Sequence, residues 1–341
     1  MRTEGNGTRV PSHPGPRSGP SHGTERDLTL RRAGPPGRWN RPMRTNTSTV
    51  IGTGTETAAP AAREPRLGVY GLTLAALVLP VVALAVSQGA DLDRIGDAPV
   101  GTQIAMYGQA FMPALAALVA CLAAGGVRAV DWGFHRVPWR TLAAAWAVPV
   151  LGVGLAYGTA WLTGAARFDP GNLAASTGLH PALGVLLGLV PGVVPFVVLA
   201  LGEQLGWSSL LVMRLAARRS PAATAVILGL AWAAFHYPLM LFVPGAVEEG
   251  VAVPYAMLMF TLQTVTLAFP LVWLRLRTRS LWPVLVCHAT VNASLYFVAE
   301  AMTSTHDRSA WMVGEGGALT TAGLAVAVLL TGRLWRRPRS R

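Results

Sequence analysis

The chain has 341 residues, of which 52% are hydrophobic and 13% are charged, and its mean hydropathy is +0.43. These values exclude an ordinary soluble domain and indicate a protein with many membrane-spanning segments. The net charge of +12 does not indicate nucleic-acid binding, because the basic residues form no stripe interleaved with aromatic residues.

Residues 1–65 are rich in Arg, Pro, Gly, Ser and Thr and contain no long apolar run. This composition predicts a disordered cytoplasmic tail, whose arginines are suited to contact anionic membrane lipid. The tail lacks the apolar core of a signal peptide, so the first span is the expected insertion signal. Met43 is an alternative start of the chain.

Apolar runs of about 20 residues, the length that crosses a bilayer as a helix, recur along residues 66–335. They predict an all-α, polytopic membrane helical bundle of about eight transmembrane helices. The expected spans cover residues 67–86, 102–124, 141–163, 182–201, 222–243, 253–274, 281–299 and 311–331.

The arginines test this count, because basic residues of short loops stay on the cytoplasmic side. The chain has no Lys, and 25 of its 28 arginines fall in the amino-terminal tail, in the loops after the second, fourth and sixth spans, and at the carboxyl terminus. Arg94, Arg167 and Arg308 fall on the other side, where most of the acidic residues also lie. We therefore expect a multi-pass protein of the cell membrane with both termini in the cytoplasm.

Four polar residues lie inside three of these apolar stretches: Glu203, His236, His288 and Asn292. Ionisable groups in hydrocarbon are costly, so they face the bundle interior and are candidates for function. A rise of 1.5 Å per residue places all four in one layer, within about 12 Å of depth. Glycines and prolines between 188 and 195 predict a kink in the fourth span that opens room near Glu203.

The sequence around these residues resembles the CPBP family, the CAAX-protease and bacteriocin-processing intramembrane proteases. Residues 202–211 (GEQLGWSSLL) are similar to its first motif, which is a Glu-Glu pair followed after three residues by Arg. An aromatic residue four before His236, and His288 four before Asn292, match the second and third motifs. The resemblance covers a core at about residues 181–299.

Two positions depart from the family's pattern, because Gln204 replaces the second Glu and Ser208 replaces the Arg. Both charges are missing together, so no unpaired charge is left in the membrane. Since i and i+4 share a helix face, we expect Gln204 and Ser208 to form a neutral polar contact. The departure puts catalytic competence in question but leaves the four candidate residues in place.

The resemblance implies an intramembrane glutamic endopeptidase. Glu203 would be the base that activates water, His236 would orient that water, and His288 and Asn292 would donate hydrogen bonds to the oxyanion. A zinc site formed by Glu203, His236 and His288 is the alternative. It would need a further carboxylate as base, which Gln204 cannot provide. A metal-free enzyme acting on an unknown peptide or protein substrate is therefore favoured.

The sequence leaves three other interpretations of the function open. Ser208 and Ser209 would allow a Ser–His protease. Both residues are already positions of the first motif, so this interpretation is the weaker one. A catalytically impaired homologue could act as a membrane scaffold or immunity factor. A proton-coupled small transporter also uses intramembrane Glu and His, but it should show two-fold internal symmetry, and the polar residues have no counterpart in the first three spans.

Overall fold

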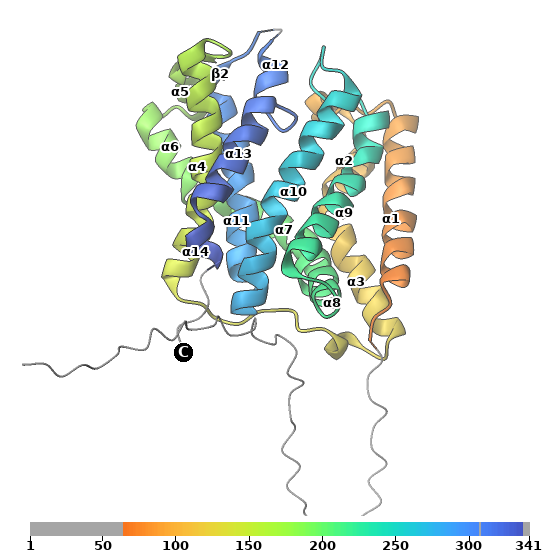
Figure 1. The fold of residues 1–341 in the computed structure, drawn as a ribbon. Coiled ribbons are helices and arrows are strands. Elements are labelled where there is room, and N and C mark those ends of the chain that lie inside the picture. The colour runs from red at the N-terminus through yellow and green to blue at the C-terminus, as the bar shows by residue number, and fades with distance from the viewer. Residues whose placement is uncertain (1–63, 307, 337–341) are drawn as a thin grey trace, which may run out of the picture. The chain divides into compact units, whose positions relative to one another are not determined.

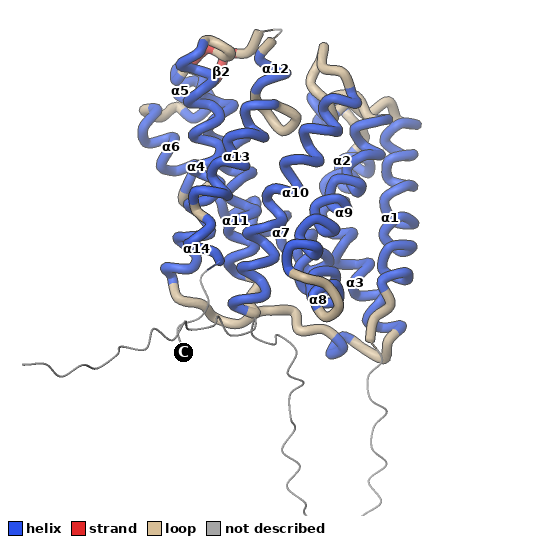
Figure 2. The backbone as a smooth tube through the Cα atoms, in the orientation of Figure 1, coloured by secondary structure: helices blue, strands red, loops and turns tan. Residues whose placement is uncertain are grey.

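The computed structural model describes residues 64–306 and 308–336. The predicted disordered tail, apart from its last two residues, and the alternative start at Met43 lie outside the described residues. Helices dominate the described part of the chain (Figures 1 and 2). In chain order they are α1 (Leu67–Ser87), α2 (Val100–Gly108), α3 (Met112–Ala123), α4 (Trp139–Thr163), α5 (Pro170–Thr177), α6 (Pro181–Leu189), α7 (Val193–Gln204), α8 (Val212–Ala216), α9 (Pro221–Phe242), α10 (Val253–Thr278), α11 (Trp282–Asn292), α12 (Ser309–Met312), α13 (Ala318–Leu330) and α14 (Gly332–Arg336).

Short elements join or extend these helices. Two π-helical turns, Leu205–Leu211 and Ala293–Ala299, continue α7 and α11. Short 3-10 turns lie at Leu92–Asp97, Gln109–Phe111, Val127–Ala129 and Glu300–Met302. The strands β1 (Arg167–Phe168) and β2 (Thr303–Ser304) pair antiparallel and tie the end of α4 to the end of the α11 segment.

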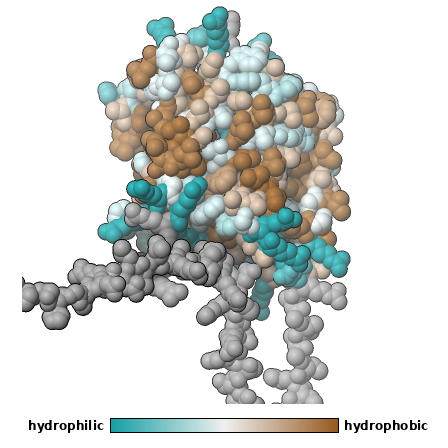
Figure 3. All heavy atoms as spheres, viewed as in Figure 1, coloured by the Kyte–Doolittle hydropathy of each residue, from teal (hydrophilic) through white to brown (hydrophobic). Residues whose placement is uncertain are grey.

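Seven helical segments are long and apolar enough to cross a membrane. They correspond to the first seven predicted spans and agree with the predicted polytopic bundle of membrane-spanning helices. Figure 3 shows hydrophobic side chains over the middle of the visible face and hydrophilic ones toward its two ends. Leu79, Leu162 and Leu329 are among the large apolar side chains that the fold leaves exposed. A lipid-facing belt accounts for their exposure.

The predicted eighth span is wrong as a single helix. The chain breaks between α12 and α13, and the longest helix left in this segment, Ala318–Leu330, has 13 residues. The reason is local: Gly314 has a φ of +83°, and a Cβ on Gly317 would lie 2.5 Å from the carbonyl of Val313. The segment still runs from one end of the bundle to the other through α12, α13 and α14 (Figure 1).

The predicted fourth span is also longer and more divided than expected. It runs over Pro181–Ala216 and breaks between α6 and α7, at the predicted kink. Trp146 of α4 donates its indole N–H to the carbonyl of Leu189 at 2.7 Å, which satisfies a polar group freed by the break. Glu203 consequently lies near the middle of this span, far from either end.

Small residues let the helices approach closely. At the contact between α4 and α13, a Cβ on Gly152 would lie 2.7 Å from the Leu324 side chain, and one on Gly323 would lie 2.5 Å from the carbonyl of Gly152. Between α9 and α10, a Cβ on Gly229 would lie 2.3 Å from the Cα of Val265. These contacts pack α4 directly against α13 and α9 directly against α10.

The two ends of the bundle differ in charge. We name the end formed by residues 124–138, 217–220 and 279–281 the Arg-rich end. The end formed by residues 88–99, 164–180, 243–252, 300–306 and 308–317 is the acid-rich end. Helix α8 and α14 lie toward the first end, and α5 and α12 lie toward the second (Figure 1).

Candidate functional site

Glu203 sits on the last turn of α7, at a point where the backbone of another helix comes very close. A Cβ on Gly202 would lie 2.5 Å from the carbonyl of Ala110, and one on Gly206 would lie 2.4 Å from the carbonyl of Pro113. The two glycines therefore allow the start of α3 to pack directly against the segment that carries Glu203. This packing fixes the height and direction of α7 at the site.

The carboxylate of Glu203 is buried, with the residue 9% exposed. Trp207, one turn further along, donates its indole N–H to Oε2 of Glu203 at 3.3 Å. Trp207 is itself buried between the rings of Tyr70 and Phe235. It is thus a core residue, as its type predicts, and it also orients the carboxylate, which the sequence analysis did not anticipate.

Both helices that carry the first and third motifs widen into a π-helical turn directly after the site residues. The turn at 205–211 begins after Gln204, and the turn at 293–299 begins after Asn292. Such turns shift the register of a helix by one residue and occur frequently at functional sites.

The expected contact between Gln204 and Ser208 is present. The Ser208 hydroxyl donates to Oε1 of Gln204 at 2.6 Å, and all of these groups are buried. On its other side, Nε2 of Gln204 lies 3.0 Å from Nδ1 of His288. An amide nitrogen only donates, so Nδ1 of His288 is the acceptor, and the neutral ring carries its proton on Nε2.

His236 has the opposite arrangement. Its Nδ1 lies 3.0 Å from the carbonyl oxygen of Trp232, which only accepts. The proton of the neutral ring is therefore on Nδ1, and Nε2 is left as an acceptor. His236 thus offers a lone pair, and His288 offers an N–H. The hydrogen bonds to Trp232 and to Gln204 thus fix a different neutral tautomer in each of the two histidines.

The four candidate residues line one cavity of about 70 Å³. Helix α7 contributes Glu203, α9 contributes His236, and α11 contributes His288 and Asn292. The structure therefore brings together in one cavity the residues that the sequence placed in one layer. Their chemical roles remain predictions.

A zinc site and a Ser–His protease are the two alternative chemistries that the sequence leaves open. Among residues 64–306 and 308–336, no three His, Cys, Asp or Glu side chains are grouped as metal ligands. Ser208 donates to Gln204, and Ser209 donates to the carbonyl of Trp132 at 2.8 Å. Both hydroxyls are thus engaged away from the two histidines, which does not favour a Ser–His arrangement.

Several further residues that were not predicted from the sequence line the same cavity. Gln263 and Thr264 come from α10, Thr320 comes from α13, and Glu315 comes from the break before α13. The amide of Gln263 donates to Thr321 at 3.1 Å and so joins α10 to α13. An amide inside an apolar span was a signal that could have identified Gln263. The position of Glu315 depends on the break, which no apolar periodicity reveals.

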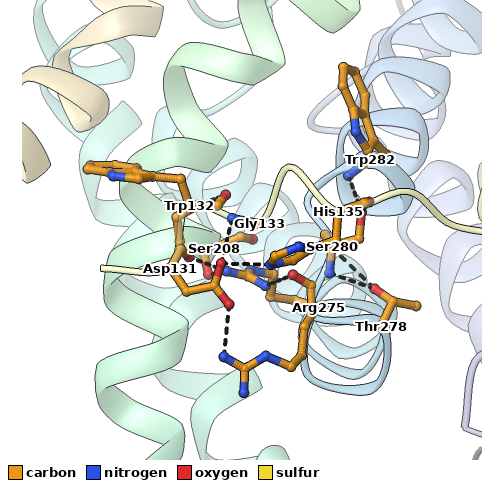
Figure 4. Close-up of polar contacts among 11 residues, drawn as sticks. Asp131, Trp132, Gly133, His135, Ser208, Arg275, Thr278, Ser280 and Trp282 are labelled. Atoms are coloured by element: carbon orange, nitrogen blue, oxygen red, sulfur yellow. Dashed lines mark hydrogen bonds and ion pairs between the residues drawn. The ribbon is translucent and has the colours of Figure 1, made fainter. Parts of the chain in front are cut away.

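A buried arginine joins three segments at the Arg-rich end by hydrogen bonds (Figure 4). Arg275 of α10 is 0% exposed and donates to the carbonyls of Ser208, Asp131 and Arg279. The carboxylate of Asp131 in turn pairs with Arg279 at 2.9 Å and accepts from Gly133. This network ties the loop between α3 and α4 to the π-helical turn that follows Gln204.

Comparison with known families agrees with this geometry. Residues 184–294 match the family described as type II CAAX prenyl endopeptidase Rce1-like. The match runs from α6 into the π-helical turn after α11, and it includes all four candidate residues together with Gln204 and Ser208. No curated protein matches the chain. The CPBP resemblance is thus confirmed for about a third of the chain, and the activity is a separate question.

Proposed function

We propose that this protein is an intramembrane endopeptidase of the CAAX prenyl endopeptidase type, in which Glu203 activates the attacking water. One observation carries the proposal: a buried carboxylate, a histidine acceptor and a histidine donor line the same cavity. Peptide hydrolysis needs a base for water, a donor for the oxyanion and a proton for the leaving amine. The family match supports the same reaction class.

The proposed steps use groups already in place. Glu203 takes a proton from water, and Nε2 of His236 accepts a hydrogen bond from the same water and orients it. The hydroxide adds to the peptide carbonyl carbon, and the oxyanion accepts hydrogen bonds from Nε2–H of His288 and from the Asn292 amide. The C–N bond then breaks, and protonated Glu203 returns its proton to the amine.

No step of this scheme requires a metal ion, so we propose a metal-free enzyme. Zinc bound by Glu203, His236 and His288 is the alternative. Chelator treatment separates the two, because a metal-free enzyme keeps its activity after dialysis against a strong chelator and gains none on addition of Zn²⁺.

The direct test is a hydrolysis assay of the purified protein in mild detergent against a peptide library. We expect the wild-type protein to cleave a subset of peptides, and Glu203→Gln to lose at least about 100-fold in kcat, the usual contribution of a general base. Glu249→Gln is the matched control, because Glu249 lies exposed in the loop before α10. Unchanged kcat in Glu203→Gln would remove the proposed mechanism, and a wild-type protein that cleaves nothing would favour the scaffold or immunity role.

We further propose a location in the cell membrane with the Arg-rich end and both termini in the cytoplasm, since 25 of the 28 arginines would then lie on that side.

A further inference from the structure

A second, larger cavity adjoins the candidate site. It has a volume of about 340 Å³, against about 70 Å³ for the inner cavity. His236, Phe260 and Glu315 line both cavities. The inner cavity is too small to hold a peptide segment, whereas the outer one approaches the size of ligand-binding pockets. The outer cavity is therefore the adjoining space from which a chain could reach the four site residues.

The outer cavity belongs to the acid-rich end of the bundle. Its walls include the turn after α1, the loop between α9 and α10, and the break before α13. The first two are tied together, because the N–H of Leu92 donates to the carbonyl of Pro244 at 2.9 Å. A Cβ on Gly245 would lie 2.6 Å from Oδ1 of Asp91, so these loops are also in close contact. The mouth of the cavity is thus built by packed segments.

The site is closed toward the opposite end. Below Glu203, the residues Trp207, Ser208 and Leu210 are all at most 1% exposed. Arg275 donates to the carbonyls of Ser208 and Asp131 and so holds the loop between α3 and α4 against the π-helical turn (Figure 4). Entry from the Arg-rich end would require this network to open. Entry from the acid-rich end requires no such change.

The outer cavity has a single sign of charge. Asp93, Glu248, Glu300 and Glu315 line it, and no Arg does. Within residues 64–306 and 308–336, none of these four carboxylates forms an ion pair with an Arg. Partial burial, followed by the nearby Asp93, raises the pKa of Glu248, as expected where carboxyl groups lie close together. Such a cavity favours a cationic ligand.

A second observation indicates that the connected inner cavity receives a polar ligand. The indole N–H of Trp232 and the hydroxyl of Thr320 line it and have no hydrogen-bond partner among the described residues, although both side chains are more than nine-tenths buried. Buried polar groups without a partner are costly, and a peptide backbone offers the carbonyl and N–H groups that would satisfy them.

We propose that the outer cavity is the entrance of the site, and that it takes from the acid-rich side of the membrane a peptide segment carrying basic side chains. The identity of the ligand as the peptide to be cleaved rests on the proposed function. The basic side chains would lie among the four carboxylates, and the peptide backbone would extend past His236 into the inner cavity.

Cysteine labelling tests the entrance without relying on catalysis. Ala246 and Ala310 both line the outer cavity, so Ala246→Cys and Ala310→Cys each place a thiol in it. The native Cys121 and Cys287 are buried, and the wild-type protein measures their background. The thiol is treated with a cationic and with an anionic methanethiosulfonate of similar size, and the rates are normalised to those of a free thiol.

We expect the cationic reagent to be favoured by about tenfold, which corresponds to about 1.4 kcal/mol. Glu300→Gln combined with Glu315→Gln should reduce this preference to that of an exposed control, Ala217→Cys at the Arg-rich end. On intact cells, an impermeant reagent should label the cavity cysteines and leave Ala217→Cys unlabelled. Equal rates for the two reagents, or the reverse pattern of sidedness, would overturn the proposal.

Protection then tests the ligand class. In the Glu203→Gln background, so that bound peptide is not consumed, a ten-residue peptide with two arginines should slow the labelling of Ala246→Cys at least about fivefold. The same peptide with two glutamates should not. Protection by neither peptide would overturn the proposed ligand even if the cavity were accessible. If the wild-type protein hydrolyses no peptide while the arginine peptide still protects the cysteine, the proposed function is overturned and the proposed entrance is supported.

Discussion

Gln204→Glu is the most informative single change, because it restores one charge of the family's first motif. Gln204 is 1% exposed, accepts from the Ser208 hydroxyl and donates to Nδ1 of His288. Glu has nearly the same shape, but it removes the donor to His288 and adds a second carboxylate next to Glu203. The neutral His288 would then have to move its proton to Nδ1 or become charged.

The expected cost follows from the partners that remain. Burying an ion costs several kcal/mol in effective terms. Ser208 and a re-protonated His288 could each return a charge-assisted hydrogen bond of about 1.5–3 kcal/mol. We therefore expect Gln204→Glu to lower the free energy of unfolding by about 1–3 kcal/mol. The melting temperature in mild detergent should fall by about 2–4 °C for each kcal/mol. Gln88→Glu, at an exposed position after α1, is the matched control and should cost less than about 1 kcal/mol.

Ser208→Arg supplies the missing counter-charge. Alone it should be strongly destabilising, by at least about 3 kcal/mol, because it places an unpaired charge at a fully buried position whose carbonyl already binds Arg275. With Gln204→Glu it can form the ion pair of the family's motif and recover the loss caused by that change. The double-mutant cycle isolates this coupling from the separate costs of each substitution. Additivity within about 0.5 kcal/mol would refute the reasoning.

Three further changes test other parts of the structure by melting temperature. Partial burial raises the pKa of Glu248 in the folded state. The contribution of this carboxyl to stability is therefore fully present below its unfolded pKa and is lost as the pH rises through its folded pKa. Glu248→Gln should therefore raise the melting temperature at pH 7 but not at pH 3. Gly152→Ala would place a Cβ 2.7 Å from a leucine of α13 and should cost about 1–3 kcal/mol, whereas Gly154→Ala, two residues along the same helix in open space, should cost nothing; equal effects would contradict the packing of α4 on α13. Burial raises the pKa of Asp131, but hydrogen bonds, that from Arg279 first, outweigh it and lower the pKa overall. Its contribution to stability should be present above about pH 4 and disappear as pH falls through the folded pKa, and Asp131→Asn should abolish that acid-dependent step.

The layer of the site could be predicted because it depends on local rules. Apolar runs give the spans, the rise of the helix gives the depth, and i, i+4 spacing places His288 and Asn292 on one face. The same rule gave the contact between Gln204 and Ser208. These features use only positions within one helix, so a single sequence contains the information.

Long-range features could not be predicted in this way. Arg275 was counted only as a loop arginine, yet it is fully buried and binds a carbonyl that lies 144 residues earlier in the chain. Likewise, the tautomer of His288 is set by an amide 84 residues away. The position of Glu315 depends on a break whose glycines were read as part of an apolar span. In each case the missing information is which segments meet.

The neutral pair at 204 and 208 bears directly on whether the site is active. A chain that had given up catalysis would gain stability by also replacing Glu203, because a buried carboxylate costs free energy unless it is hydrogen-bonded or protonated. Instead Glu203 is present, is oriented by Trp207 and lines a cavity with both histidines. The amide of Gln204 keeps His288 as a donor on its Nε2 side, whereas a carboxylate there would draw the proton to Nδ1. The two departures from the motif therefore change how His288 is held, while its Nε2–H stays available as the donor that the proposed mechanism requires.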